Sequence, residues 1–487
     1  MNDLYDIVII GAGVSGTYIA RELSRYDLKI LILDKDNDVA NETTSANSAI
    51  IHAGYDPKPG TAMAKFNAPG NLMFDKVCKE LDVPFKRCGS LVIGFDDHDK
   101  ETIETIYQRG LTNGVPDIRI LNHDEVLEIE PNLNPDVKLA LYAPTAGIIN
   151  PWELAIALAE NAIDNGAELK LETRVTDIKK EDDSYLIITD KGNYLTKYVV
   201  NCAGVYADDI HNMVAKPSYS IRPRKGNYYV LDNSVKNLVD HVIFQAPTKK
   251  GKGVLIAPTV DGNFLIGPDS DFIDDKNDNS TGMDNLNYIK NSGLKSCPSI
   301  PFDKVIRSFA GLRATSDHED FIIGEVEDSK GFFEVGGFES PGLSSIPAVA
   351  EYVVDLINQR HGGLRKKDDF NPTRRPVIRF NHLPQEVKAK LIQKDPAYAN
   401  VICRCETITE AEIVDCIHRK AGARSLKAVK KRVRPGAGRC QGGFCGPKVV
   451  EILARELGKD WSDIPYDSSK AYILTGETKE ESGGENL

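Results

Sequence analysis

The sequence predicts an α/β protein with a parallel first sheet, a second, antiparallel sheet and a small helical module that carries cysteines. Three observations support this fold class. Two apolar strand-like segments flank a helical segment within residues 6–34. Strand-rich segments follow one another through residues 221–333 and suggest an antiparallel sheet. Four of the nine cysteines form two tight pairs between residues 403 and 445.

The first stretch, DIVIIGAGVSGTYIARELSRYDLKILILD, contains a strand, a glycine-rich loop, a helix and a second strand that ends at Asp34. Gly11 suits the tight turn, Gly13 the approach of backbone to a pyrophosphate, and Gly16 close packing of helix on strand. The helix N-terminus then offers N–H groups to the phosphates, and Asp34 is placed to accept from a ribose hydroxyl. An ordinary glycine-rich βαβ turn is the alternative. We therefore expect a Rossmann-like dinucleotide-binding domain.

Length and charge narrow the class of protein. A chain of 487 residues is long enough for two or three domains. Its 60 Lys and Arg against 72 Asp and Glu give a net charge of -12, which argues against a nucleic-acid partner. No apolar run approaches the roughly 20 residues of a transmembrane helix, and no signal peptide is visible. We expect a cytoplasmic protein, which is compatible with peripheral contact to a membrane through a partner.

Three later segments are expected to reach the same cofactor as the glycine loop. Residues 42–60 are polar and glycine-rich, and their side chains can donate to a pyrophosphate or a cofactor ring, a plain turn-rich loop being the alternative. Their candidate donors are Thr44, Ser45, Asn47 and Ser48. The segment VVNCAGVYAD again ends a buried strand in small residues, Ala203 and Gly204. A helix beginning near Gly342 directs a positive dipole end at the site.

Regular elements are predicted between these motifs. Helices are expected over residues 62–81, 100–112 and 152–166, and a small meander over residues 168–202. The charged, proline-containing stretch after residue 360 is typical of a linker, and the polar tail 475–487 of disorder. The isolated cysteines are expected to be reduced and to pack as small apolar groups. They are Cys78, Cys88, Cys202, Cys297 and Cys416.

Five motifs together carry a family resemblance: GAGVSG with Asp34, IIHAG, NCAGVYAD, GLRA and GGFESPGLSS. They resemble the FAD-dependent oxidoreductases of the D-amino-acid oxidase and glycerol-3-phosphate dehydrogenase superfamily, over roughly residues 3–357. The resemblance implies an oxidoreductase domain at 1–360, with FAD-binding parts at about 1–84, 145–215 and 330–360 and substrate-sheet parts at about 85–144 and 216–329. The implied FAD contacts are Gly11, Gly13, Gly16, Asp34, Lys35, Thr44, Ser45, Asn47, Ser48, Val175, Ala203, Gly204, Gly337, Gly342, Leu343 and Ser344.

The C-terminal motifs CRCETITEAEI and RPGAGRCQGGFC resemble a bacterioferritin-associated-ferredoxin-like domain. This resemblance implies a 2Fe-2S domain at 399–458, after a linker at 361–398, and zinc bound by four cysteines is the alternative. Its implied ligands are Cys403, Cys405, Cys440 and Cys445. The module is also rich in basic residues between 419 and 439, which indicates either a docking face for an acidic redox partner or a solvated helix face.

Two residues are candidates for the chemistry. His52 is the only histidine of its region and is the first candidate for the base, with a structural role as the alternative. Arg313, in GLRA, matches the position where the superfamily places an arginine for an anionic substrate, with a surface strand charge as the alternative. Glycerol-3-phosphate dehydrogenases of this type carry a lysine and an arginine after the glycine pair, whereas this chain has GGFESPGLSS.

Two other stretches, SAIIHAGYDPKPGTAMAKF and RPRKGNYYVLD, resemble L-2-hydroxyglutarate dehydrogenase and its relatives. The prediction is therefore an FAD- and 2Fe-2S-dependent dehydrogenase. It oxidises the CH–OH of a small anionic substrate, either glycerol 3-phosphate or an L-2-hydroxy acid such as 2-hydroxyglutarate. Electrons pass through the cluster to a partner acceptor, and a homo- or hetero-oligomer is expected. Two alternatives stay open: an amine or amino-acid dehydrogenase of the superfamily, and a non-catalytic electron-relay subunit.

Overall fold

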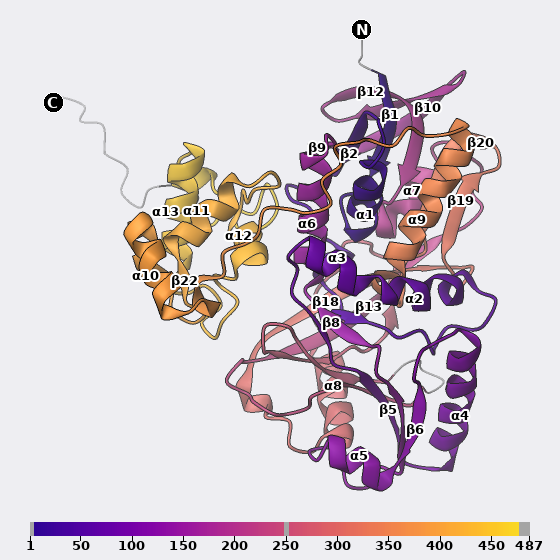
Figure 1. Ribbon diagram of the computed structural model, residues 1–487, viewed down its shortest axis with the longest axis vertical. Coiled ribbons are helices and arrows are strands. Elements are labelled where there is room, and N and C mark those ends of the chain that lie inside the picture. The colour runs from indigo at the N-terminus through magenta and orange to yellow at the C-terminus, as the bar shows by residue number, and fades with distance from the viewer. Residues whose placement is uncertain (1–3, 248–252, 477–487) are drawn as a thin grey trace, which may run out of the picture. The chain divides into compact units, whose positions relative to one another are not determined.

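The computed structural model describes residues 4–247 and 253–476, which form two compact units (Figure 1). Unit 1 comprises residues 1–35 and 39–376, and unit 2 comprises residues 36–38 and 377–487. Within the described ranges, no helix is long and apolar enough to cross a membrane. The predicted tail at 475–487 lies outside the described residues from position 477 onward.

The first sheet of unit 1 has eight strands and is parallel at its centre. β1 pairs in parallel with β2 and β12, and β20 continues the parallel part beside β12. The antiparallel run β10–β11–β12 confirms the meander predicted over 168–202. The strands are β1 Leu4–Ile10, β2 Ile30–Leu33, β9 Glu168–Lys170, β10 Val175–Glu181, β11 Ser184–Thr189, β12 Gly192–Asn201, β19 Ile322–Val326 and β20 Ser329–Gly336.

Three helices of unit 1 pack on one another beside this sheet: α1 Val14–Leu23, α6 Pro151–Asp164 and α9 Gly342–His361 (Figure 1). The predicted helix at 152–166 is α6, which begins with Pro in its first turn and an Asn150 side chain that accepts from the Glu153 N–H. α9 begins at Gly342, as predicted. Because α9 packs on α1, the N-termini of these two helices belong to the same unit.

The second sheet has nine strands and is mostly antiparallel, which confirms the predicted architecture. Its two longest strands, β13 and β18, pair along their whole length. The strands are β5 Ser90–Gly94, β6 Arg119–Asn122, β7 Leu139–Ala143, β13 Ile221–Leu231, β14 Val242–Gln245, β15 Leu255–Pro258, β16 Phe264–Gly267, β17 Asp271–Phe272 and β18 Val305–Ser316. A smaller sheet joins β3 Ile50–Ile51, β8 Gly147–Ile149 and β4 Phe85–Arg87.

The remaining helices of unit 1 pack on the second sheet, on α9 or on other parts of the unit. The helix predicted at 62–81 is divided in two at Met73. The helix predicted at 100–112 begins earlier, because the Asp96 side chain caps it by accepting from the Asp99 N–H. These helices are α2 Ala62–Leu72, α3 Phe74–Glu80, α4 Asp97–Thr112, α5 His123–Ile129, α7 Ala207–His211 and α8 Met283–Ser296.

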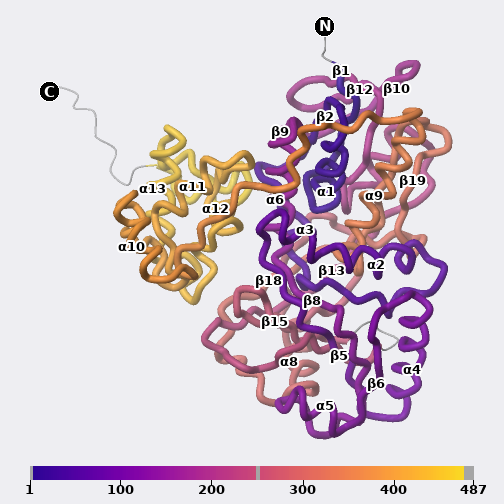
Figure 2. The backbone as a smooth tube through the Cα atoms, in the orientation of Figure 1, coloured from indigo at the N-terminus to yellow at the C-terminus, as the bar shows by residue number. Residues whose placement is uncertain are grey.

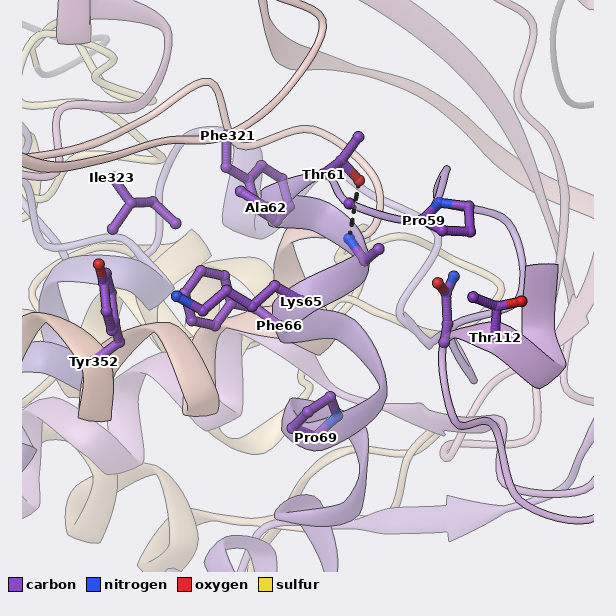
Figure 3. Close-up of a pocket in the computed structure, with 13 residues that line it drawn as sticks. Pro59, Thr61, Ala62, Lys65, Phe66, Pro69, Thr112, Phe321, Ile323 and Tyr352 are labelled. Carbon is purple, nitrogen blue, oxygen red and sulfur yellow. Dashed lines mark hydrogen bonds between the residues drawn. The ribbon is translucent and has the colours of Figure 1, made fainter.

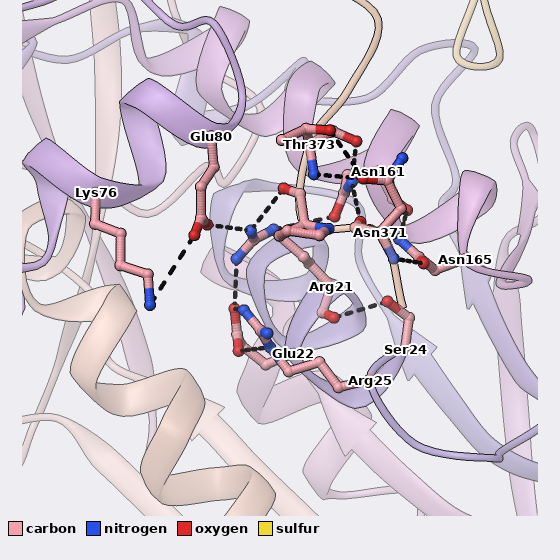
Figure 4. Close-up of polar contacts among 11 residues, drawn as sticks. Arg21, Glu22, Ser24, Arg25, Lys76, Glu80, Asn161, Asn165, Asn371 and Thr373 are labelled. Atoms are coloured by element: carbon pink, nitrogen blue, oxygen red, sulfur yellow. Dashed lines mark hydrogen bonds and ion pairs between the residues drawn. The ribbon is translucent and has the colours of Figure 1, made fainter. Parts of the chain in front are cut away.

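The first part of the expected 361–398 linker is fixed to unit 1. The Asn161 amide donates to the carbonyls of Asn371 and Thr373 at 3.0 Å each, and these residues lie beside Arg21 in Figure 4. The Arg374 side chain is 2% exposed and forms an ion pair with Glu160 at 3.1 Å. Residues 361–376 therefore belong to unit 1 and are not a free tether.

The second part of that linker is folded into unit 2. It contains α10 Gln385–Lys394 and the buried Tyr398, whose ring stacks on Phe380 at 5.6 Å. Unit 2 also holds α11 Glu410–His418, α12 Leu426–Val433 and α13 Gly446–Leu457 (Figure 2). It contains in addition the short pair β21 Val401–Cys403 and β22 Ile408–Thr409. The described cysteines are free thiols, and the isolated ones, which the sequence predicts to be half-buried, are buried except for Cys88.

Candidate active site and cofactor-binding regions

The glycine loop leaves no room for side chains. Gly11 has φ +105°, and a Cβ there would lie 2.4 Å from the Cys202 carbonyl oxygen. A Cβ on Gly16 would lie 1.9 Å from the Gly11 carbonyl oxygen. Gly13 is the N-cap residue of α1 and, having no side chain, provides no cap of its own to the first N–H groups of the helix. This cradle fits a pyrophosphate held by N–H groups.

Asp34 lies directly behind the loop. Its carboxylate accepts from the Ala12 N–H at 2.6 Å, and its carbonyl accepts from the Thr173 N–H at 2.8 Å. The second contact places the start of β10, at Val175, near the end of β2. Lys35 forms an ion pair with Glu42 at 2.5 Å. The carboxylate therefore orders the loop in addition to the ribose contact that the sequence predicts.

The four candidate donors of the polar loop lie in different places. Thr44 is at the N-terminus of α1, where its hydroxyl accepts from the Val14 N–H at 3.0 Å. Ser45 donates to carbonyls within its own loop, and the Asn47 amide does the same. The Ser48 hydroxyl is 3.0 Å from that of Tyr228 on β13. Thr44 thus lies beside the glycine loop, whereas Ser48 lies toward the second sheet.

The later candidate residues lie in two places, one near the glycine loop and one near Asp320. Ala203 lies against the loop, because its Cα is 3.4 Å from the position of a Cβ on Gly11. Gly204 follows with φ +58°. Gly337 has φ +71°, and a Cβ there would lie 2.8 Å from the Asp320 carbonyl oxygen. Leu343 is partly buried in the first turn of α9, next to Gly342.

His52 is held at the N-terminus of α9. Its backbone N–H donates to the Ser344 hydroxyl at 2.7 Å, and its Nε2 is 3.2 Å from the Ser340 hydroxyl. Its carbonyl accepts from the amides of Asn67 and Asn71, which are both 1% exposed. The backbone of this histidine is fixed on both sides, so the imidazole has a defined position, as a catalytic base requires.

Arg313 stands directly opposite Arg224 in the β13–β18 ladder. Its Nη2 contacts the Asp269 carbonyl at 3.4 Å. Arg224 forms an ion pair with Glu339 at 2.5 Å, and Glu339 precedes the Ser340 that meets His52. Burial lowers the pKa of Arg224, Glu339 opposes that shift, and the Arg313 guanidinium lowers the pKa further. The imidazole thus meets Ser340, whose chain neighbour Glu339 pairs with the Arg224 guanidinium, and Arg313 is the ladder partner of Arg224.

The sequence alone makes His52 and Arg313 candidates for the chemistry, but it does not single out Arg224, Glu339 or Ser340. Arg224 and Arg313 are far apart in the chain, and only the register between β13 and β18 brings them together. A usable signal was present, because RPRKG places two arginines at alternate positions of a predicted strand.

The four paired cysteines form the second candidate site, in unit 2. Cys405 and Cys440 have sulfurs 3.8 Å apart, and the Cys445 thiol lowers the pKa of Cys403 to about 6 by a hydrogen bond. Among the described residues, no three His, Cys, Asp or Glu side chains converge on one metal ion. Two pairs of thiols fit a two-iron cluster, whereas one zinc would require all four to meet at one point.

The basic residues of this module do not form one free face. Lys431 and Arg432 are buried and form ion pairs with Asp38, a residue of unit 2, at 2.8 and 2.7 Å. Burial raises the pKa of Asp38, but the two cations outweigh it and hold that pKa at about 2. Of the basic residues between 419 and 439, three are exposed, namely Lys420, Arg424 and Arg439. Phe444, beside Cys445, is 87% exposed.

A cavity of about 620 Å³ lies along α2, and none of the predicted site residues lines it (Figure 3). The Lys65 ammonium lies 4.1 Å from the centre of the Tyr352 ring, close to Phe66. The cavity is thus a feature of the α2 and α9 surface, apart from the site around His52.

Comparison with known proteins defines the class. Residues 6–356 match the family of FAD dependent oxidoreductases, and residues 401–455 match the BFD-like [2Fe-2S] binding domain. Because the first match covers most of the chain, the protein belongs to the FAD-dependent oxidoreductase family. The predicted cofactors, FAD and a 2Fe-2S cluster, are confirmed, as is the predicted enzyme class.

Particular relatives narrow the class further. Glycerol 3-phosphate dehydrogenase from Caloramator mitchellensis is 55% identical over 478 residues, covering 98% of this chain and 100% of the relative. Glycerol 3-phosphate oxidase from Mycoplasma genitalium is 35% identical and covers 75% of this chain and 97% of the relative. L-2-hydroxyglutarate dehydrogenase from Bos taurus is 28% identical and covers 73% of this chain and 89% of the relative.

Solved structures agree in fold. The dithionite-reduced L-α-glycerophosphate oxidase from Mycoplasma pneumoniae, with FAD bound, has a TM-score of 0.74 and 32% identity, covering 77% of this chain and 100% of that one. Glycine oxidase from Geobacillus kaustophilus has a TM-score of 0.67 and 23% identity, covering 76% and 97%. The second likeness shows a shared fold alone.

Proposed function

We propose that the protein is a glycerol-3-phosphate dehydrogenase that oxidises the secondary alcohol of glycerol 3-phosphate to the ketone. The observation that carries this proposal is the pair of ladder partners Arg224 and Arg313, with Glu339 bound to Arg224 and its neighbour Ser340 meeting the His52 imidazole. The likeness to the Caloramator enzyme, which extends over both domains, supports the same substrate. The alternative, an amine or amino-acid dehydrogenase, has less support, because an amine needs no cation and an amino acid needs one for its carboxylate.

The residues of the chain have separate roles in this reaction. We assign the His52 Nε2 as the acceptor of the hydroxyl proton, with Ser340 orienting the ring. FAD, when bound, takes up the hydride from the substrate carbon. Its pyrophosphate is held by the loop at Gly11, Gly13 and Gly16, and the N-terminus of α9 favours negative charge beside His52.

Arg313 anchors the anionic end of the substrate. Its Nη1 is buried and has no hydrogen-bond partner among the described residues, so it can donate to an incoming oxygen. Replacing Arg313 with Ala or Lys is expected to raise KM strongly, because a guanidinium holds a phosphate or carboxylate by two parallel bonds. An unchanged KM for every anionic substrate tried would refute the anchor.

Electrons leave through unit 2 in this proposal. Cys405 is exposed and Cys440 partly so, whereas Cys403 and Cys445 are buried, so one edge of the cluster faces outward. We propose that an acidic redox partner docks at this edge, where Phe444 and the exposed Arg439 lie. The predicted cytoplasmic location, peripheral membrane contact and oligomer formation belong to the same proposal.

The decisive experiment is anaerobic bleaching of the bound flavin. The panel is glycerol 3-phosphate, L-2-hydroxyglutarate, lactate, malate and amino acids. We expect bleaching by glycerol 3-phosphate. Bleaching by L-2-hydroxyglutarate alone would identify that compound as the substrate in place of glycerol 3-phosphate. Bleaching by amino acids would identify an amino-acid dehydrogenase, and no bleaching at all would support a relay subunit.

The variant His52→Asn tests the assigned base in the same assay. It should bind FAD as the wild type does, because its backbone contacts to Ser344, Asn67 and Asn71 remain. Flavin reduction should slow by about 10²- to 10⁴-fold, the usual contribution of a positioned base. A rate within a few fold of the wild type would exclude His52 as the base.

A further inference from the structure

We propose that Arg224 binds the anionic group of the substrate together with Arg313, and that Glu339 is an exchangeable counter-ion that a phosphate dianion displaces. This inference rests on the proposed function and deepens it, because it assigns the chemistry that selects a phosphate ester over a monocarboxylate. It also gives the chain a second cation for the substrate, although the segment GGFESPGLSS contains no basic residue.

The position of the pair is fixed by strand register. Arg224 on β13 and Arg313 on β18 are direct partners in the antiparallel ladder. Side chains at such positions leave Cβ atoms about 4.5–5.5 Å apart, and like charges placed directly opposite are unfavourable. The next residue on the same face of β13 is Gly226, where a Cβ would lie 2.7 Å from the Arg313 Nη2. The absence of a side chain there leaves space for the guanidinium.

The donors of the pair are incompletely used. The Arg224 Nε and the Arg313 Nη1 are buried, and neither has a hydrogen-bond partner among the described residues. By contrast, the buried Arg374 contacts two carboxylates and two carbonyls. A buried donor without a partner is costly, and proteins keep such groups mainly where a ligand completes them. A phosphate has enough acceptor oxygens for both guanidiniums.

Glu339 neutralises one of the two positive charges. Its Oε2 accepts from the Arg224 Nη2 at 2.5 Å and from the Thr315 hydroxyl at 2.8 Å. The pair therefore keeps one uncompensated positive charge while Glu339 is in place. A dianion that replaces Glu339 leaves the pair neutral, and its oxygens can take over the contacts to Arg224 and Thr315. A monocarboxylate matches the one uncompensated charge with Glu339 in place, so only a dianion gains by displacing Glu339 and engaging both guanidiniums.

The test is calorimetric titration of the full-length, FAD-loaded protein with inorganic phosphate. In Arg224→Gln the dissociation constant should rise about 10- to 100-fold, the effect expected from losing hydrogen bonds to a charged group. Arg222→Gln is the matched control, because Arg222 lies on the same strand but is exposed and paired with Asp274. The dissociation constant of phosphate for Arg222→Gln should equal that for the wild type. No phosphate binding by the wild type, or equal binding by Arg224→Gln, would overturn the proposal.

Three further measurements separate binding from folding. Arg224→Lys keeps the charge without the fork and should bind phosphate with intermediate affinity, so it replaces Arg224→Gln if that variant loses FAD. Glu339→Gln should bind phosphate more tightly than the wild type, and weaker or equal binding would overturn its role as counter-ion. For glycerol 3-phosphate, Arg224→Gln should raise KM with kcat nearly kept, whereas a fall in kcat alone would indicate a structural role and overturn the proposal.

These results are distinguishable from failure of the proposed function. If glycerol 3-phosphate does not bleach the flavin, the assigned reaction is wrong, yet phosphate binding that depends on Arg224 still supports the anion site. If bleaching occurs and phosphate binding is independent of Arg224, the reaction stands and the arginine pair does not.

Discussion

The glycine loop at residues 11–16 and the site around Arg224 and Arg313 lie in the same unit and present different groups to their ligands. The loop offers backbone N–H groups, and its side chains are absent because a Cβ at Gly11 or Gly16 would meet a carbonyl oxygen within 2.4 Å. The arginine site offers side chains from paired strands, with buried donors left unused. Space therefore limits substitution in the glycine loop, whereas charge and hydrogen bonding limit it at the arginine site.

The largest expected effect is at Gly11. In Gly11→Ala, the Cβ would lie 2.4 Å from the Cys202 carbonyl oxygen, which is backbone and cannot move without displacing the sheet. We expect the variant to be isolated without FAD, as measured by the ratio of flavin absorbance at about 450 nm to protein absorbance. The effect should exceed the roughly 1–3 kcal/mol typical of overpacking.

A matched control isolates the steric part of this effect. Gly60 has φ +89°, close to the +105° of Gly11, but a Cβ at Gly60 would meet nothing within 4 Å. Gly60→Ala should keep its FAD and lose only about 1–2 kcal/mol of stability, the cost of the left-handed backbone conformation. If both variants lost FAD equally, backbone strain rather than space would govern the loop.

The cysteine module differs from the glycine loop, because its implied ligands are side chains and not backbone groups. Cys405→Ser should abolish the visible absorption of the 2Fe-2S cluster while the flavin stays bound and is still bleached by substrate. Turnover with an acceptor that takes electrons from the cluster should then be lost. The measurement is iron and sulfide content together with anaerobic flavin reduction.

Cys416 is the control for that variant. It is 1% exposed in the same module, and burial raises the pKa of its thiol to about 12, so it is an inert packed group. Cys416→Ala should keep the cluster and cost only about 1–2 kcal/mol of stability. A cluster that survived in Cys405→Ser, or was lost in Cys416→Ala, would show that the ligands are misassigned.

Much of the fold could be predicted because its signals are local. The turn at Gly11, the cap and periodicity of α6 and the alternation of the meander are each encoded within about a dozen residues. The paired cysteines are likewise recognisable from spacing. These features do not depend on how distant segments pair.

The rest could not be predicted, because it depends on long-range register and packing. The position of Arg224 opposite Arg313 follows from a ladder whose two strands are far apart in sequence. Residues 361–398 have the polar composition of a linker, yet Arg374 is buried against carboxylates of α6 and Tyr398 is buried in unit 2. Composition alone cannot show that such charges are compensated.

A buried ion-pair network should respond more strongly than an exposed one. Arg374→Ala leaves the carboxylates of Glu153 and Glu160 buried without this cation, so it should lower the free energy of unfolding by about 3–5 kcal/mol. Arg375→Ala, at the exposed neighbouring position, should change it by less than about 0.5 kcal/mol. Equal effects in denaturant unfolding would mean that residues 361–376 are not clamped by this network.

The smallest expected effect is pH-dependent and lies at His211, a buried group that the reaction does not use. Its Nδ1 is 2.8 Å from the Glu334 carboxylate, whose hydrogen bond raises the pKa of His211 above its usual 6.5, against the opposing effect of burial. A raised pKa stabilises the fold fully below pH about 6.5, and this contribution is lost as the pH rises through the folded value.

The variant His211→Asn cannot carry that charge, although its amide can still donate to Glu334. Its unfolding temperature should therefore fall furthest below the wild type near pH 6, and the gap should narrow toward pH 9. His98→Asn, at an exposed position of α4, is the control for loss of a histidine elsewhere. A difference in unfolding temperature for His211→Asn that stayed constant from pH 6 to 9 would mean that His211 contributes by packing and neutral hydrogen bonding. Substitution at this buried pair would then be limited by space, as it is in the glycine loop.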